Sequence, residues 1–288
     1  MQEERLRIVE GSWEEVDLGP HDALITALDR HLEGLGMEGE QEKPQNVLSW
    51  TLCLKKMIIR VLKLLPHQAN HNYLTNYIDR NNTLPIVSTY WTTPPFPTPH
   101  TGHSGSAPIE RKIYHALARM KNVQRICEIG FNAGHSASLW LMANPTAEVI
   151  MFDLWAHNSS DPGARFLLSP EARALGIQDA ASRLRIIKGD STKTVVDFSA
   201  ENPSVKCDLL SVDGGHTHDV ALADIRHMHN LANPRFNTVV IDDTQCDLPW
   251  CVDSALEEHQ RRGTLQKLLS VSIAPRLGSR GLTIAAYA

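Results

Sequence analysis

Residues 125–153, RICEIGFNAGHSASLWLMANPTAEVIMFD, constrain the fold more than any other part of the chain. Short apolar runs predict strands over Ile126–Ile129 and Val149–Phe152, and the segment between them predicts a helix that begins at about His135. Two strands joined by a turn and a helix form the βαβ unit of a parallel sheet, which helices cover. The segment therefore predicts an open α/β fold.

The turn of this unit contains Gly130 and Gly134, and Asp153 closes the second strand. Glycine has no Cβ, so the backbone of this turn can come close to a ligand. In open α/β sheets, ligands bind outside the carboxyl ends of the strands, where Asp153 is expected to lie. A carboxylate at that position can accept hydrogen bonds from both hydroxyls of a ribose. The unit is therefore predicted to bind a nucleoside.

The spacing of the glycines limits which nucleoside cofactor can bind. The dinucleotide fingerprint G-x-G-x-x-G needs a middle glycine beside the pyrophosphate, but Asn132 occupies that position here. The sequence also lacks the phosphate-binding pattern G-x-x-x-x-G-K-[ST]. A nicotinamide-dependent oxidoreductase is thus disfavoured, and a nucleoside cofactor without a pyrophosphate fits better.

The pattern Glu128-x-Gly130-x-x-x-Gly134, with an acid at the end of the next strand, resembles the first two motifs of class I S-adenosylmethionine-dependent methyltransferases. The resemblance implies that the glycine turn lies against the methionine part of the cofactor and that Asp153 holds the ribose. Asp190, in Gly-Asp-Ser after the third strand, would reach the adenine end; the alternative is that it only caps the next helix. The residues expected to contact the cofactor are Glu128, Gly130, Phe131, Asn132, Gly134, His135, Ser136, Asp153, Leu154, Asp190, Ser191 and Asp213.

The chain from Pro108 onward alternates between strands and helices. Further strands are predicted over Leu184–Lys188, Cys207–Val212, Asn237–Ile241, Leu265–Ile273 and Gly281–Tyr287. Further helices are predicted over Pro108–Met120, Ser169–Ser182, Thr192–Ala200, Asp219–Leu231 and Leu248–Arg262. Such alternation predicts a doubly wound sheet. We expect a Rossmann-like α/β domain over residues 108–288, with a seven-stranded, mostly parallel sheet and the antiparallel C-terminal hairpin that class I methyltransferases have.

Residues 1–107 are predicted to form a helical extension that includes a lid-like loop. Ser49–Leu65 is amphipathic, with leucine, isoleucine and valine on one face and lysine and arginine on the other. We expect this helix to cover the core or to form the interface of a homo-oligomer; the alternative is that it lies on a membrane surface. The proline-rich segment that follows has no periodicity, and loops of this length are often lids.

Three further carboxylates follow neighbouring strands. Asp213 follows the fourth strand in D-G-G-H, and Asp242 and Asp243 follow the fifth in I-D-D. Because carboxylates at adjacent strand ends repel one another, we expect a cation among them. Mg²⁺ takes oxygen ligands and keeps some of its water, so its open positions can hold a substrate oxygen. The three aspartates are therefore candidate ligands of a divalent metal.

These two segments, D-G-G-H and I-D-D, resemble those of metal-dependent O-methyltransferases of the macrocin and mycinamicin type. That resemblance implies that Asp213, Asp242 and Asp243 hold the metal and that His216 is the general base. Histidine can accept a proton near neutral pH, and a metal lowers the pKa of a bound hydroxyl. His218 is the alternative base.

The net charge of −5 at pH 7 gives no electrostatic reason to expect a nucleic acid as partner. The first residues lack a secretory apolar segment, and no uncharged apolar run is long enough to span a bilayer. The five cysteines contain no C-x-x-C pair, and Cys127 and Cys207 fall in predicted strands. They are expected to be reduced thiols in the core of a cytoplasmic protein.

The sequence thus predicts an S-adenosylmethionine-dependent methyltransferase that acts on a hydroxyl of a small molecule, such as a natural product or a sugar, with Mg²⁺. Two alternatives stay open. One is a metal-independent enzyme of the same fold that methylates an amine or a carboxylate. The other is a catalytically silent methyltransferase-like domain that acts as a binding protein.

Overall fold

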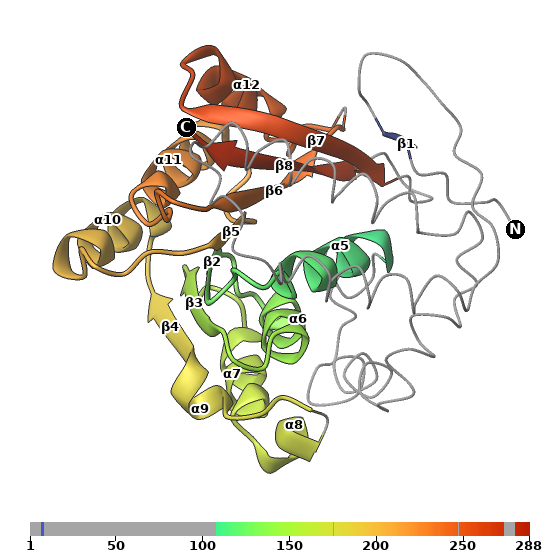
Figure 1. Ribbon diagram of the computed structural model, residues 1–288, viewed down its shortest axis with the longest axis vertical. Coiled ribbons are helices and arrows are strands. Elements are labelled where there is room, and N and C mark those ends of the chain that lie inside the picture. The colour runs from blue at the N-terminus through green and yellow to red at the C-terminus, as the bar shows by residue number, and fades with distance from the viewer. Residues whose placement is uncertain (1–6, 9–107, 175, 247, 274–279) are drawn as a thin grey trace, which may run out of the picture.

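The computed structural model describes residues 7–8, 108–174, 176–246, 248–273 and 280–288. In this part of the chain, helices cover both faces of one twisted sheet (Figure 1). The amphipathic helix predicted over Ser49–Leu65 and the lid-like loop lie outside the described residues. The division at residue 107 therefore stays a prediction.

The sheet has eight strands in the order β1-β7-β8-β6-β5-β2-β3-β4. Their bounds are β1 Arg7–Ile8, β2 Arg125–Ile129, β3 Glu148–Asp153, β4 Leu184–Lys188, β5 Leu209–Val212, β6 Thr238–Thr244, β7 Leu265–Ile273 and β8 Arg280–Tyr287. Strands β2 to β6 are parallel to one another, and β8 and β7 are antiparallel to their neighbours. The predicted parallel sheet with an antiparallel hairpin is thus confirmed. The short strand β1 pairs with β7 and adds an eighth strand that was not predicted.

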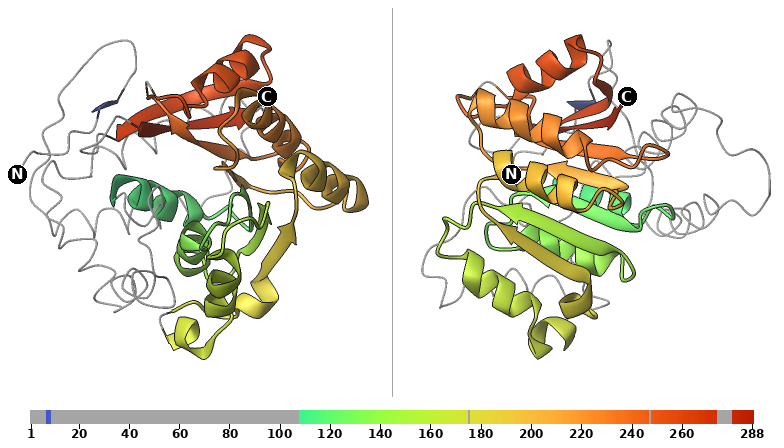
Figure 2. Two further views of the ribbon diagram at one scale, coloured as in Figure 1. Left: turned by 180° about the vertical axis from the view of Figure 1, so that it is seen from behind. Right: turned by 90° about the vertical axis from the view of Figure 1, so that its left-hand side faces the viewer.

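The helices form two layers, one on each face of the sheet (Figure 2). Their bounds are α5 Pro108–Ala118, α6 His135–Ala143, α7 Ser160–Leu167, α8 Pro170–Ala174, α9 Ala180–Arg183, α10 Ser191–Glu201, α11 His218–His229 and α12 Asp253–Arg261. Apolar residues of α5, α6 and α7 pack on one face of the sheet, and those of α10, α11 and α12 pack on the other. Side chains of β2 alternate between the two cores, as period-two strand geometry requires.

The segment after β3 differs from the prediction. A loop followed by one helix over Ser169–Ser182 was expected, but the chain forms the three short helices α7, α8 and α9. Gly176 has a φ of 99°, which a helix cannot continue. Gly163 lets α7 lie close to the turn, because any residue with a Cβ at this position would bring that atom within 2.2 Å of the carbonyl oxygen of Ala133. Helix α7 can therefore pack directly on the glycine turn.

Strand β6 ends in a bulge that contains two of the candidate metal ligands. Ile241 pairs with Thr283 and Thr244 with Gly281, so β6 has one more residue than β8 between these pairs. The extra residue is accommodated at Asp243, whose φ is 53°. In a regular strand, adjacent side chains point to opposite faces. The bulge breaks that alternation at Asp243, and both Asp242 and Asp243 are buried, as is the rest of β6.

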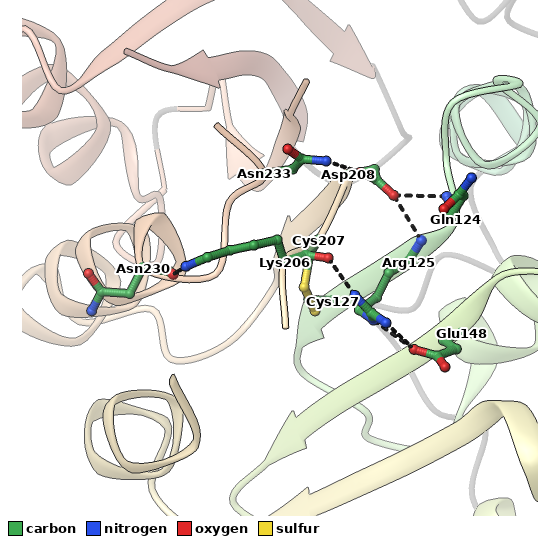
Figure 3. The surroundings of a disulfide bond; sticks show 9 residues. All are labelled: Gln124, Arg125, Cys127, Glu148, Lys206, Cys207, Asp208, Asn230 and Asn233. Carbon is green, nitrogen blue, oxygen red and sulfur yellow. Dashed lines mark hydrogen bonds and ion pairs between the residues drawn. A yellow bond between two sulfur atoms is a disulfide. The ribbon is translucent and has the colours of Figure 1, made fainter. Parts of the chain in front are cut away.

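Cys127 and Cys207 are joined by a disulfide, with their Cα atoms 5.9 Å apart (Figure 3). Both residues are fully buried, as predicted, but the expectation that they are reduced thiols is wrong. They are 80 positions apart in the sequence, and only the pairing of β2 with β5 brings them together. Beside them, the carboxylate of Asp208 accepts hydrogen bonds from the backbone of Gln124 and Arg125.

A second disulfide joins Cys246 and Cys251 in the loop between β6 and α12.

In the part of the chain that the structure describes, no helix has the length and apolar character that crossing a bilayer would require.

Candidate active site

The glycine turn follows β2, leads into α6 and lies against the residue that follows β5. Gly130 has a φ of 106°, and its N–H donates to the carbonyl oxygen of Phe152 at 2.8 Å. A Cβ at Gly130 would lie only 1.9 Å from the carbonyl oxygen of Asp213. The turn and the D-G-G-H segment are therefore in direct backbone contact. Only glycine satisfies both the backbone conformation and this distance.

Asp153 is buried at the carboxyl end of β3 and binds the turn itself. Its Oδ2 accepts hydrogen bonds from the N–H groups of Phe131 at 2.8 Å and Asn132 at 3.0 Å. Its Oδ1 accepts one from the N–H of Trp155 at 2.6 Å. The carboxylate therefore shapes the turn that the sequence analysis assigned to the cofactor. Contact with a ribose stays a prediction.

Glu128 lies inside the protein, on the face of β2 that α6 covers. Its Oε2 accepts hydrogen bonds from the hydroxyl of Ser136 at 2.7 Å and the indole N–H of Trp140 at 2.9 Å. Its Oε1 accepts one from the hydroxyl of Ser211 at 2.9 Å. Burial raises the pKa of Glu128 to about 7, although these hydrogen bonds act against the rise. The glutamate thus ties β2, α6 and β5 together beneath the site.

An aromatic stack that the sequence did not predict covers the turn. The rings of Phe131 and Trp155 are stacked with centroids 5.4 Å apart, and Nζ of Lys188 lies 3.9 Å from the centroid of Trp155. The indole N–H of Trp155 donates to Asp161 at 2.9 Å. Trp155, two residues after the acidic strand end, gave no sequence signal for this stack, because the contact depends on its left-handed backbone, with a φ of 61°.

Other predicted cofactor residues surround the turn. His135 and Ser136 are buried in the first turn of α6, and Gly134 precedes that helix with a φ of 85°. Asn132 accepts a hydrogen bond from Ser159 at 3.1 Å. Leu154 is 67% exposed, which makes it an apolar side chain available to a ligand.

Asp190 caps helix α10. Its Oδ1 accepts hydrogen bonds from the N–H of Thr192 at 3.0 Å and from its hydroxyl at 2.7 Å. The capping alternative is therefore observed, and a contact of Asp190 with the cofactor stays a prediction. Ser191 donates its hydroxyl to Asp224 of α11 at 2.7 Å. Asp224 is fully buried and was not singled out from the sequence, where it is one acid among several on an amphipathic helix.

The carboxylates of Asp213 and Asp243 lie close together at the ends of β5 and β6. Ligand atoms of Asp213, His216 and Asp243 are all within 4.8 Å of one another. Burial, and then the charges of Asp242 and Asp243, raise the pKa of Asp213 well above its usual range. Asp242 is also buried, and its Oδ1 accepts a hydrogen bond from the N–H of Asp243 at 2.9 Å. The structure therefore gathers Asp213, His216 and Asp243, whereas Asp242, the third predicted metal ligand, does not belong to this close group.

His216 is part of this cluster, and His218 is not. The Nε2 atom of His216 lies 3.0 Å from Oδ2 of Asp243, and its side chain is 40% exposed. The ring of His218 instead faces helix α12, with Nδ1 2.9 Å from Ser254 and Nε2 3.5 Å from Glu258. This geometry favours His216 over His218 as a base.

A small hollow lies beside the cluster. Its walls come from the D-G-G-H segment, helix α11 and the end of β6, namely Val212, Asp213, Gly214, Gly215, His216, Ala221, Ile225, Ile241, Asp242, Asp243 and Val252. The carboxylate oxygens that face it are ligands that a hard divalent cation prefers. Burial is the main cause of the raised pKa of Asp213, and a cation would offset the carboxylate repulsion that adds to it. The residues present therefore fit a Mg²⁺ ion.

The model of a methyltransferase domain family matches residues 127–244, which span the glycine turn, Asp153 and all three candidate metal ligands. Residues 127–244 are therefore similar to a methyltransferase domain. The strand order and the antiparallel hairpin agree with this assignment. No curated protein sequence matches the chain.

Several solved structures share the fold of this methyltransferase domain. One is the O-methyltransferase TomG from Streptomyces achromogenes, involved in tomaymycin synthesis, in complex with S-adenosylmethionine. It is 20% identical, covers 72% of this chain and 89% of its own, and has a TM-score of 0.52. An O-methyltransferase from Bacillus cereus in complex with S-adenosylhomocysteine is 14% identical, covers 73% of this chain and 100% of its own, and has a TM-score of 0.52.

Cofactor-bound Rv0187 from MTB is 17% identical, covers 86% of this chain and 99% of its own, and has a TM-score of 0.50. These three structures are at most 20% identical to this chain, so the comparison shows only that the fold is shared.

Proposed function

We propose that this protein transfers the methyl group of S-adenosylmethionine to a hydroxyl of a small molecule and that it uses Mg²⁺ to do so. The observation that carries the proposal is the contact between Gly130 and Asp213. Because a Cβ at Gly130 would lie 1.9 Å from the Asp213 carbonyl, the proposed cofactor site and the carboxylate cluster share one wall. A methyl donor in one half would therefore face an acceptor in the other.

The predicted residues near the first turn of α6 and at the ends of β3 and β4 have separate roles in this proposal. The N–H groups at the start of α6, around His135 and Ser136, would receive the methionine carboxylate, and Asp153 would hold the ribose. Asp190 would reach the adenine end of the cofactor, and Leu154 and Ser191 would also contact the cofactor. S-adenosylmethionine would supply the methyl group.

The acceptor half would orient the nucleophile and take its proton. Bound Mg²⁺ would lower the pKa of the acceptor hydroxyl. Asp213, Asp242 and Asp243 would hold that ion, and His216 would accept the proton, since its ring nitrogen already lies beside Asp243. The half-exposed position of His216 lets the proton pass on to solvent.

Two measurements test this function. Titration calorimetry with S-adenosylhomocysteine checks the cofactor site, and absence of binding would support a silent methyltransferase-like domain. Methyl transfer to a panel of hydroxylated small molecules is then measured before and after chelation with EDTA. We expect activity to disappear with EDTA and to return with added Mg²⁺. Activity that EDTA leaves unchanged would instead favour the metal-independent enzyme.

A further inference from the structure

The loop after the candidate metal ligands is closed by its own disulfide. Cys246 and Cys251 are both half-buried, and their Cα atoms are 5.9 Å apart. The bond closes a ring over residues 246–251 between the end of β6 and the start of α12. Nothing in the proposed methyl transfer needs a disulfide at this place.

This ring is attached to the backbone of Asp243. The sulfur of Cys246 lies 3.7 Å from the carbonyl oxygen of Asp243. The same oxygen accepts a hydrogen bond at 3.0 Å from the N–H of Val252, which directly follows the ring. The carboxylate of Asp253 accepts a hydrogen bond at 3.1 Å from the N–H of Gln245, the residue that precedes the ring. The residue after the ring is therefore bonded to the candidate metal ligand, and residues on the two sides of the ring are bonded to each other.

Asp243 needs such support because its backbone is strained. Its φ is 53°, and that of Gln245 is 59°. Left-handed backbone at residues other than glycine persists where the surrounding structure holds it in place. The Asp243 carboxylate in turn lies 3.0 Å from Nε2 of His216. A looser ring would thus release the residue that joins the cluster to its histidine.

We propose that Cys246 and Cys251 form a thiol–disulfide exchange site that reacts with a small dithiol and whose oxidation state sets the position of Asp243. The effect on methyl transfer rests on the proposed function; the exchange site itself does not. Oxidation holds the ring closed and the carboxylate cluster assembled. Reduction opens the ring and lowers the activity.

The reaction follows ordinary thiol–disulfide exchange. A thiolate of the dithiol attacks the sulfur of Cys246, the bond between the two cysteines breaks, and Cys251 leaves as a thiolate. The N–H of Leu248 lies 3.1 Å from the sulfur of Cys251, where it stabilises this leaving group. The second thiolate of the reagent then releases Cys246. The protein pair gains two electrons and two protons, and the dithiol becomes a cyclic disulfide.

The chain contains its own control for this reaction. Cys127 and Cys207 form the other disulfide and are fully buried, so a reagent cannot reach them in the folded protein. Trp250 adjoins Cys251 and is 45% exposed, so its fluorescence reports on the ring. The two disulfides differ in accessibility, and selective reduction of one is therefore expected.

The experiment treats the full-length protein with increasing dithiothreitol and then with iodoacetamide, and maps the labelled cysteines by mass spectrometry. We expect label at Cys246 and Cys251 under conditions that leave Cys127 and Cys207 unlabelled. Trp250 emission should rise on reduction, because a neighbouring disulfide quenches it, and the Trp250→Phe variant should lose that change. Equal labelling of both pairs, or iodoacetamide labelling of Cys246 and Cys251 before any reduction, would overturn the exchange site.

Hydrogen exchange tests the link to Asp243 without any need for activity. Reduction should raise the exchange rate of the Gln245 and Val252 amides several-fold, and unchanged rates would overturn the link. Methyl transfer should fall several-fold on reduction and return on reoxidation, and the Cys246→Ser/Cys251→Ser variant should have the lower activity with or without dithiothreitol. Activity that selective reduction leaves unchanged would overturn the regulation. Faster exchange in a protein that transfers no methyl group would support the link to Asp243 and refute the proposed function.

Discussion

The carboxylate of Asp153 accepts a hydrogen bond at 2.8 Å from the backbone N–H of Phe131, one residue into the glycine turn. The same oxygen accepts a second bond from the N–H of Asn132 at 3.0 Å. One side chain therefore shapes the turn and also stands where the ribose is proposed to bind. Local stability and cofactor affinity are linked through this residue.

Replacement of Asp153 with alanine should affect both properties. The substitution leaves buried N–H groups of the turn without an acceptor, so the free energy of unfolding should fall by about 2–4 kcal/mol. Affinity for S-adenosylhomocysteine, measured by calorimetry below the melting transition, should fall by at least about tenfold, equivalent to about 1.4 kcal/mol. Asp197→Ala on the exposed side of α10 is the control. Unchanged cofactor affinity in Asp153→Ala would remove Asp153 from the binding site.

The two histidines of the D-G-G-H-T-H segment form a matched pair for testing the base. His216→Ala should lower kcat by on the order of 10²- to 10⁴-fold and leave the affinity for S-adenosylhomocysteine unchanged. His218→Ala removes the contacts with Ser254 and Glu258, so a lower melting temperature with nearly unchanged kcat is expected. If instead His218→Ala lost the activity and His216→Ala kept it, the assignment would be reversed.

Asp224 should make stability depend on pH. Burial raises its pKa from 3.8 to about 6. The folded protein therefore holds this proton more tightly than the unfolded chain does. The resulting stabilisation is complete below pH 4 and is lost as the pH rises through 6. With about 1.4 kcal/mol for each pKa unit, the loss approaches about 3 kcal/mol.

The isosteric variant Asp224→Asn should not show this loss. Its stability relative to wild type should therefore increase between pH 4.5 and pH 7.5, as measured by urea unfolding at a series of pH values. Asp197→Asn, exposed on α10, should follow wild type throughout. Parallel curves for Asp224→Asn and wild type would show that the Asp224 carboxyl titrates normally.

The buried disulfide between Cys127 and Cys207 should contribute strongly to stability. It links residues 80 positions apart, and closing a loop of that length restricts the unfolded chain considerably. The Cys127→Ala/Cys207→Ala variant should therefore lose about 3–5 kcal/mol of unfolding free energy. Denaturation without reductant should expose no thiol from this pair. Two reactive thiols at these positions in unreduced, unfolded protein would contradict the pairing.

The parts of the site that depend on local sequence were predicted well. Gly130, Gly134 and the acid at the end of the next strand have a recognisable spacing. That spacing predicted the turn, helix α6 and the position of Asp153 at the carboxyl end of its strand. The alternation of elements also predicted the parallel sheet and the hairpin. Asp190 illustrates the limit, since a cap and a ligand contact have the same local pattern, and the structure shows the cap.

The parts that depend on distant contacts could not be predicted. The hydrogen bond from Ser211 to Glu128 and the Cys127–Cys207 disulfide each require β2 and β5 to be neighbours in the sheet. The bulge at Asp243 depends on how β6 pairs with β8. Helices α8 and α9 were predicted as one helix because the break at Gly176 could not be told from periodicity alone, and α7 was predicted as a loop.

That bulge also sets an order of assembly for the two halves of the site. The turn and Asp153 belong to one contiguous segment, which can form as soon as β2, α6 and β3 have been synthesised. Asp243 acquires its position only when β8, made more than thirty residues later, pairs with β6. A nascent chain can therefore form the glycine turn of its cofactor half while its acceptor half is still incomplete. Methyl transfer then has to wait for the last strand of the sheet.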